Sequence, residues 1–115
     1  MSSIISQLSG IGLVPVVKIE RAEDAILLAD ALIRGGLPCA EITFRTPAAA
    51  EAIRRISKAR PDLLVGAGTV LTCEQADTAM DAGAKFLVSP GLDAQVVRYC
   101  LEKGYPILPG TSCPT

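Results

Sequence analysis

Residues 63–91, LLVGAGTVLTCEQADTAMDAGAKFLVSPG, contain the pattern that decides the fold. An apolar run at 63–67 is followed by a segment of helical periodicity and then by a second apolar run at 86–89. Thr72 and Gln75 have the spacing of a capping box at the start of that helix. We therefore predict a strand–helix–strand unit with parallel strands.

The same alternation continues on both sides of this unit. The predicted strands are residues 13–19, 39–44, 63–67, 86–89 and 107–108, after an amphipathic segment at 2–8. Glycine or proline ends each predicted helix, at Gly35, Pro61, Gly83 and Gly104. The residues expected to face the sheet include Ala49, Ala52, Ile53 and Ile56 on one helix, and Val96, Val97, Cys100 and Leu101 on the last.

The order (βα)4β fits two closed α/β folds. A TIM barrel needs eight units and about 250 residues, whereas five strands suffice for a flavodoxin-like doubly wound sheet. A complete doubly wound domain would add a helix after the fifth strand, and none is predicted here. We therefore predict the N-terminal (βα)4β portion of a TIM (β/α)8 barrel, with residues 1–115 forming one partial barrel and no second domain.

Composition excludes several classes of protein. The 115 residues are 50% hydrophobic and carry a net charge of −1, without the basic block expected of a nucleic-acid-binding protein. No apolar run approaches the ~20 residues of a membrane span, and the N-terminus does not resemble a signal peptide. Histidine is absent and the four cysteines match no zinc motif. We expect a cytoplasmic protein with reduced thiols and no metal.

Polar side chains gather at the C-terminal ends of the predicted strands, where α/β barrels build their sites. They are Lys18, Glu41, Thr43, Arg45, Thr69, Ser89, Thr111 and Ser112. Doubly wound sheets also bind ligands at strand C-termini. The distribution therefore predicts a ligand site without choosing between the two folds.

Glu41 is the most informative of these residues. Alternation along the strand places Glu41, Thr43 and Arg45 on the face away from the helices, which is the interior of a barrel. The same alternation groups further residues with them, namely Val65, Ala67 and Thr69 on the third strand and Leu87 and Ser89 on the fourth. Desolvation would raise the pKa of the Glu41 carboxyl group and Arg45 would lower it, a balance suited to proton transfer. A structural ion pair is the alternative.

The other candidates each have two interpretations. Arg45 offers a planar fork for a carboxylate or phosphate, or a salt bridge to Glu41 alone. The glycines of the run 66–69, GAGT, allow either close approach of a ligand or tight internal packing. Lys18 either attracts an anion or is an exposed lysine at a strand end.

Five segments together resemble the family of 2-keto-3-deoxy-6-phosphogluconate (KDPG) aldolases and their relatives that cleave 4-hydroxy-2-oxoglutarate. They are VPVV at 14–17, EITFRT at 41–46, VGAGTV at 65–70, GAKFLVSPG at 83–91 and LPGT at 108–111. The resemblance covers nearly the whole chain and corresponds to the first half of the family's (β/α)8 barrel.

The resemblance implies an aldehyde-lyase of the Entner–Doudoroff pathway. The family cleaves a phosphorylated keto acid to pyruvate and glyceraldehyde 3-phosphate through a lysine Schiff base, without metal or cofactor, as a homotrimer. By resemblance, Glu41 is the catalytic acid/base and Arg45 binds the pyruvyl carboxylate region. Thr69 and Pro90 match substrate-contacting positions, and Lys18 is a weaker candidate for substrate binding.

The sequence departs from the family in one large respect. The Schiff-base lysine of the sixth strand and the phosphate-binding loops of the seventh and eighth do not occur before Thr115. Lys85 begins its predicted strand at the wrong end to replace that lysine. We therefore expect the 115 residues alone to lack aldolase activity. A self-contained ligand-binding α/β module and a self-associating half-barrel remain the alternatives.

Overall fold

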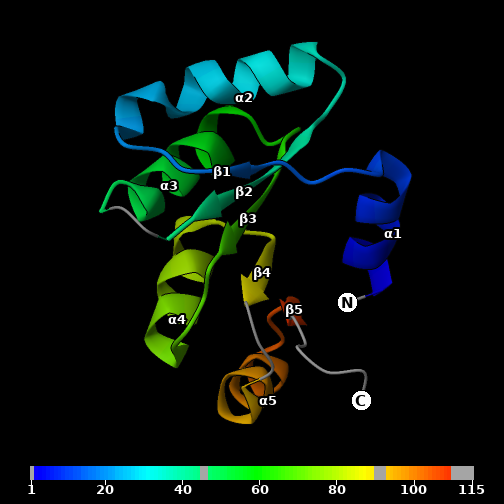
Figure 1. Ribbon diagram of the computed structural model, residues 1–115, viewed down its shortest axis with the longest axis vertical. Helices are drawn as coiled ribbons and strands as arrows, with labels where there is room; N and C mark the ends of the chain where they lie inside the picture. The colour runs from blue at the N-terminus through cyan, green and yellow to red at the C-terminus, as the bar shows by residue number, and fades with distance from the viewer. Residues whose placement is uncertain (1, 45–46, 90–92, 110–115) are drawn as a thin grey trace.

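A computed structural model describes residues 2–44, 47–89 and 93–109, and Figure 1 shows its helices and strands. Within these ranges the elements follow the predicted alternation. The helices are α1 (Ser2–Ile11), α2 (Ala25–Arg34), α3 (Ala49–Ala59), α4 (Cys73–Ala82) and α5 (Ala94–Lys103), with a short 3-10 helix, η1 (Ala22–Asp24), before α2. The strands are β1 (Val16–Val17), β2 (Cys39–Thr43), β3 (Leu64–Gly68), β4 (Phe86–Ser89) and β5 (Ile107–Pro109).

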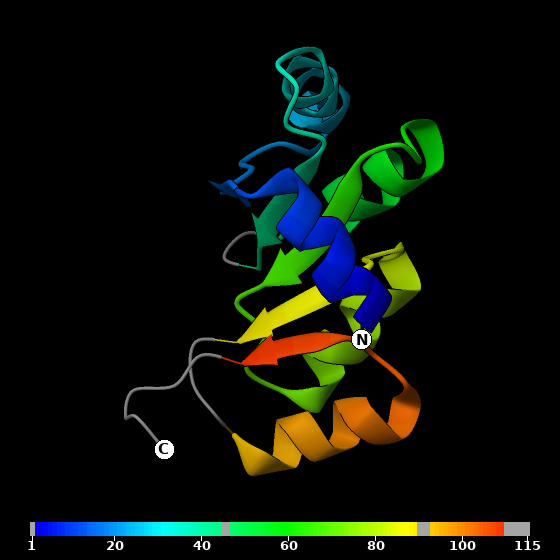
Figure 2. The same cartoon turned by 90° about the vertical axis from the view of Figure 1, so that its right-hand side faces the viewer.

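The order of the strands decides between the two predicted folds. All five strands are parallel, and each pairs with its neighbours in the sequence, in the order β1-β2-β3-β4-β5. Because parallel crossovers share one hand, an order without reversal places every connecting helix on the same side of the sheet. Figures 1 and 2 show α2, α3, α4 and α5 around the outside of a curved sheet. This is the winding of a barrel and not of a doubly wound sheet, as predicted.

The main core fills the space between the sheet and these helices. The strands contribute Ala40, Ile42, Val65, Ala67, Leu87 and Ile107, and the helices contribute mainly alanine and isoleucine. On α3, the four residues predicted to face the sheet, Ala49, Ala52, Ile53 and Ile56, are all buried. Small side chains let the helices approach the sheet closely, so the core needs few aromatic residues.

Local signals fix where the helices begin and end. The Gln75 backbone N–H donates to Thr72 Oγ1 at 3.1 Å, and the Leu71 N–H donates to Gln75 Oε1 at 2.7 Å. These two bonds satisfy donors that the helix start leaves free. Gly83 and Gly104 end α4 and α5 in the left-handed conformation, with φ of 112° and 77°.

Two predictions about the elements were wrong in detail. The predicted strand 13–19 is reduced to Val16–Val17, because it lies at the edge and pairs with β2 alone. Leu101, expected inside, is 60% exposed. The buried residues of α5, Val96 and Cys100, are four apart and form a narrow stripe, and Leu101 lies beside it.

The α1 helix lies apart from the other helices, at the N-terminal ends of the strands (Figure 2). Ile4 and Gln7 line a pocket together with residues 61–64, which lead into β3, and with Lys85, which precedes β4. Ile4 is buried there. The opposite, C-terminal ends of the strands are therefore the ends that α1 leaves open.

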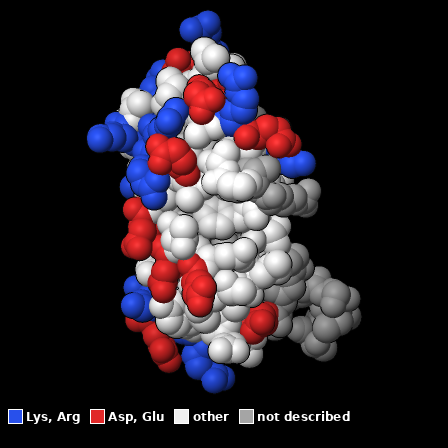
Figure 3. Space-filling view, turned by 90° about the vertical axis from the view of Figure 1, so that its left-hand side faces the viewer, with Lys and Arg blue, Asp and Glu red and all other residues white. Residues whose placement is uncertain are grey.

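Charge is mixed on the face drawn in Figure 3. Acidic and basic side chains are intermixed along one side and at both ends of this face, beside a broad area with few of them. No helix of the described residues has both the length and the apolarity needed to cross a membrane.

Candidate active site

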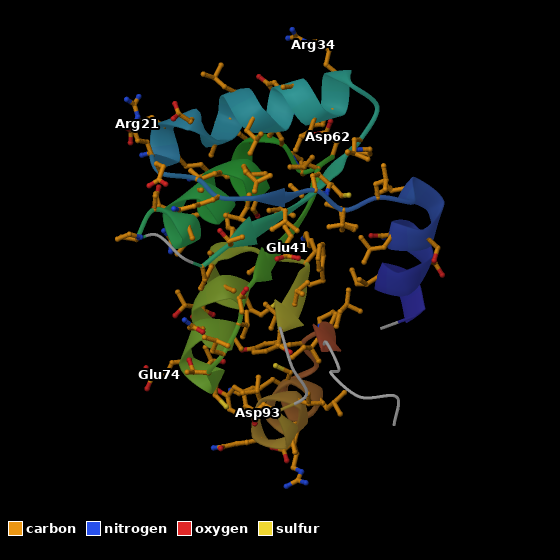
Figure 4. All side chains as sticks on the ribbon, in the orientation of Figure 1. Arg21, Arg34, Glu41, Asp62, Glu74 and Asp93 are labelled. Carbon is orange, nitrogen blue, oxygen red and sulfur yellow. The ribbon has the colours of Figure 1, made fainter. Side chains whose placement is uncertain are left out.

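Strand register identifies the residues that share a face with Glu41. Residues in register on neighbouring parallel strands point to the same side of the sheet. Glu41 pairs with Gly66, and Thr43 pairs with Gly68. Gly66 and Gly68 are in turn in register with Phe86 and Val88. Figure 4 shows the Glu41 side chain on the side of the sheet away from α3 and α4, as the alternation of β2 predicted.

The prediction that Val65 and Ala67 of β3 and Leu87 of β4 face the same side as Glu41 was wrong. Val65, Ala67 and Leu87 lie in the core between the sheet and the helices. Both faces of these strands are buried, so their sequences lack the polar–apolar alternation that marks an inner face. On β3 the residues on the Glu41 face are Leu64, at the start of the strand, and the two glycines.

These glycines make room for two side chains. A β-carbon at position 68 would lie 2.8 Å from Glu41 Cδ, and one at position 66 would lie 2.6 Å from Phe86 Cδ2. Both separations are too short for real carbon atoms. The Gly-Ala-Gly sequence of β3 therefore accommodates the Glu41 carboxylate and the Phe86 ring. This favours the packing interpretation of the motif.

The two polar residues of β2 are deeply placed. Glu41 is 8% exposed and Thr43 is 2% exposed. Thr43 Oγ1 is buried and has no hydrogen-bond partner among the described residues. A carboxylate and a hydroxyl therefore lie on one face near the C-terminal end of a central strand, both largely shielded from solvent.

The remaining candidate residues differ in how close the structure places them to Glu41. Thr69 directly follows β3 and is half-buried, at the same end of the sheet as Glu41. Lys18 is exposed, and its Nζ lies 3.2 Å from Glu20 Oε1, so it forms an exposed ion pair. Arg45 and Pro90 lie outside the described residues, as do Thr111 and Ser112.

Sequence reasoning missed Phe86 as a neighbour of this site. It also gave Thr43 no role beyond its position. The signal for Phe86 was indirect, because only the paired glycine at position 66 indicates that a large side chain crosses from the next strand.

A second polar cluster lies away from Glu41 and ties α4 to α5. Tyr99 and Tyr105 donate hydrogen bonds to the two carboxylate oxygens of Asp77, at 2.6 and 2.7 Å. These bonds lower the pKa of Asp77 and raise the pKa of each tyrosine to about 12. Lys103 Nζ lies 5.6 Å from the centre of the Tyr99 ring. The cluster joins two helices and the segment before β5, which is a structural role.

The cysteines of the described residues are free thiols, as expected for Cys39, Cys73 and Cys100. Burial raises the pKa of Cys39 and Cys100. Cys39 Sγ donates to the Leu13 carbonyl at 3.0 Å. Within the described ranges, no three residues among Cys, Asp and Glu come together in a way that would hold a metal ion.

Comparison with known proteins gives the family. The model of the family "KDPG and KHG aldolase" matches residues 4–115. The chain belongs to the KDPG and KHG aldolase family. It is 53% identical over 115 residues to the 2-dehydro-3-deoxy-phosphogluconate aldolase of Treponema pallidum, and 48% identical over 111 residues to that of Haemophilus influenzae. These matches cover 100% and 96% of this chain, and 55% and 52% of the two relatives.

Solved aldolases share the fold. The KDPG aldolase of Zymomonas mobilis matches with a TM-score of 0.82 and 45% identity over 87% of this chain and 48% of its own. The enzyme of Legionella pneumophila, with pyruvate captured at low pH as a covalent carbinolamine, matches with a TM-score of 0.83 and 39% identity, over 87% of this chain and 48% of its own. The chain spans about half the length of the aldolases it matches. The barrel winding seen here is therefore that of the KDPG aldolases.

Proposed function

We propose that this chain provides the acid/base half of a class I aldolase that cleaves KDPG to pyruvate and glyceraldehyde 3-phosphate. The observation that carries the proposal is the Glu41 carboxylate, buried on the inner face of the sheet above Gly68. Identity of 53% to a named KDPG aldolase supports the substrate class. The carbinolamine captured in the Legionella pneumophila aldolase supports the Schiff-base route.

In this proposal Glu41 moves protons at the reacting atoms. It assists the loss of water from the carbinolamine and accepts the proton released when the carbon–carbon bond breaks. Exclusion of water strengthens the electrostatic interactions between such a carboxylate and the reacting atoms, because fixed protein groups replace its solvent shell. Thr69 and Pro90 are proposed to contact the substrate, and Arg45 its pyruvyl carboxylate. Lys18 is a weaker candidate, because it pairs with Glu20.

The Schiff-base lysine is the part of the mechanism that the 115 residues do not supply. Covalent catalysis depends on the iminium, which acts as the electron sink for bond cleavage. Without it Glu41 has no carbinolamine to dehydrate. We therefore expect the chain assayed by itself to release no pyruvate from KDPG.

A hybrid enzyme tests the role of Glu41. Residues 1–115 replace the matching half of the Treponema pallidum aldolase, whose second half supplies the family's lysine segment. Pyruvate release is followed with a coupled lactate dehydrogenase assay. We expect the hybrid to be active and Glu41→Gln to lower kcat by about 100-fold or more, the scale of acid–base catalysis.

The matched control is Glu102→Gln, an exposed glutamate on α5, which should leave kcat unchanged. A folded Glu41→Gln hybrid with full activity would remove Glu41 from the mechanism. Pyruvate release by the 115-residue chain that survives Lys18→Ala and fails with Glu41→Ala would contradict the expected need for the missing lysine.

A further inference from the structure

Thr43 carries a buried hydroxyl that bonds to no other residue in the described part of the chain. It is 2% exposed, and Oγ1 has no hydrogen-bond partner among the described residues. A buried hydroxyl without a partner is destabilising, whereas valine would fill the same space without that penalty. We therefore look for a hydrogen-bond partner that the hydroxyl acquires during the proposed reaction.

The geometry of the sheet places the Glu41 carboxylate beside this hydroxyl. Thr43 is in register with Gly68, and neighbouring strands lie about 4.8 Å apart. The Glu41 side chain extends along the sheet until its carboxylate reaches the space above Gly68. The carboxylate and Thr43 are therefore on one face, at one level along the strands. Rotation about χ1 changes the direction of the Thr43 hydroxyl on this face.

We propose that Thr43 is a positioning residue for Glu41, and that its hydroxyl holds the carboxylate above Gly68 through each proton transfer. A hydroxyl donates a hydrogen bond to the ionised carboxylate and accepts one from the protonated acid. Threonine thus serves both states of a group that alternates between them. The inference rests on the proposed acid/base role of Glu41, and its coupling to Thr43 can be measured without any activity.

The strand positions in register with Glu41 that the structure describes carry no charged side chain. Val16 on β1 and Gly66 on β3 flank it, and Phe86 lies beyond Gly66. Lys18, just after β1, is exposed and paired with Glu20. Arg45, which alternation places on the same face, lies outside the described residues and is kept in every variant. A change at Thr43 therefore reports on the hydroxyl.

The test is a carboxyl-detected NMR titration of Glu41 in the 115-residue chain. We compare the natural chain with Thr43→Val, which keeps the shape, and Thr43→Ser, which keeps the hydroxyl. The bond to the ionised carboxylate is charge-assisted and therefore stronger than the bond to the neutral acid. Its loss in Thr43→Val should move the Glu41 midpoint to higher pH by about one unit. In Thr43→Ser the Glu41 midpoint should equal that of the natural chain. Equal midpoints in all three proteins would overturn the proposal.

Two further measurements keep the result decisive. If Thr43→Val loses its native spectrum, Thr43→Ala against Thr43→Ser makes the same comparison, and equal midpoints again overturn the proposal. In the hybrid enzyme, Thr43→Val should move the acidic limb of the kcat profile upward, with Thr43→Ser restoring it. An unmoved limb, in a hybrid that Glu41→Gln inactivates, refutes the role of Thr43 alone. If Glu41→Gln leaves kcat of the hybrid unchanged, the proposed function is refuted instead.

Discussion

The carboxylate of Glu41 occupies the space that a side chain at Gly68 would fill, with Cδ 2.8 Å from the position of the missing β-carbon. Gly68→Ala should therefore displace the carboxylate while leaving the core on the helix side in place. A misplacement of about 1 Å can lower the rate by about 100-fold. We expect a loss of that order in kcat of the hybrid enzyme, measured by pyruvate release.

The control for this substitution is Gly10→Ala, where an added β-carbon meets nothing within 4 Å. It should leave kcat unchanged. Overpacking at Gly68 costs about 1–3 kcal/mol of stability, so circular dichroism must first show that the variant is folded. A folded Gly68→Ala enzyme with normal kcat would show that Glu41 need not lie where the structure has it.

Gly83 and Gly104 provide a matched pair for stability, because both end helices with positive φ. An alanine at Gly104 meets nothing within 4 Å and loses about 1–2 kcal/mol to the left-handed conformation alone. At Gly83 the added carbon also lies 2.7 Å from Ser57 Cβ. We expect Gly83→Ala to lose a further 1–3 kcal/mol, roughly the penalty of overpacking, in urea unfolding.

The excess loss at Gly83 should depend on Ser57. Removing that side chain with Ser57→Gly should bring the effect of Gly83→Ala close to that of Gly104→Ala in a double-mutant cycle. Equal losses at the two glycines in the natural background would mean that α3 moves aside without penalty.

The fold could be predicted from the sequence because its signals are local and repeated. Thr72, Gly83 and Gly104 act within a few residues of themselves, and the structure shows them at the expected helix ends. The choice of a barrel needed more, namely the absence of a predicted helix after the fifth strand. The strand order confirms that choice.

The inner face of the sheet was predictable only where polarity marks it. Glu41 revealed the face of β2, because a carboxylate does not point into an alanine and isoleucine core. On β3 and β4 both faces are apolar, and the assignment of Val65 and Leu87 was wrong. Which side chain fills the space above Gly66 depends on register between strands, which no short stretch of sequence encodes.

Asp77 should make the stability of the chain depend on pH in the acidic range. Hydrogen bonds from Tyr99 and Tyr105 lower its pKa in the folded state below the ordinary value of 3.8. Its stabilisation is therefore complete above that value and is lost as the pH falls through the lower, folded pKa. Asp77→Asn should be less stable than the natural chain at pH 7, and the difference should shrink toward pH 3 in urea unfolding.

Glu74→Gln, an exposed change on the same helix, is the control and should show no such trend. A constant difference between pH 7 and pH 3 would mean that the Asp77 charge does not matter to the cluster.

Because of Tyr99 and Tyr105, the stability of the chain should also fall at high pH. Their pKa values are raised to about 12 in the folded chain, from an ordinary value of 10.0. The contribution of each hydroxyl is therefore complete below pH 10 and is lost as the pH rises toward 12. Spectrophotometric titration should show two late tyrosinates, and Asp77→Asn should move both midpoints down. Tyrosinates that form near pH 10 in the natural chain would contradict the hydrogen bonds to Asp77.

Cysteine reactivity tests the packing on both sides of the sheet. Cys39 and Cys100 are fully buried, and burial raises the pKa of both thiols, which lowers the fraction of reactive thiolate. Cys73, at the start of α4, is half-buried. Cys113, the fourth cysteine of the sequence, lies outside the described residues and is replaced by serine. In this background, iodoacetamide followed by peptide mass spectrometry should modify Cys73 first. Cys39 and Cys100 should react at least about tenfold more slowly, at a rate set by opening of the fold. Comparable rates at all three positions, with circular dichroism still native, would mean that the sheet and α5 open far more often than this packing allows.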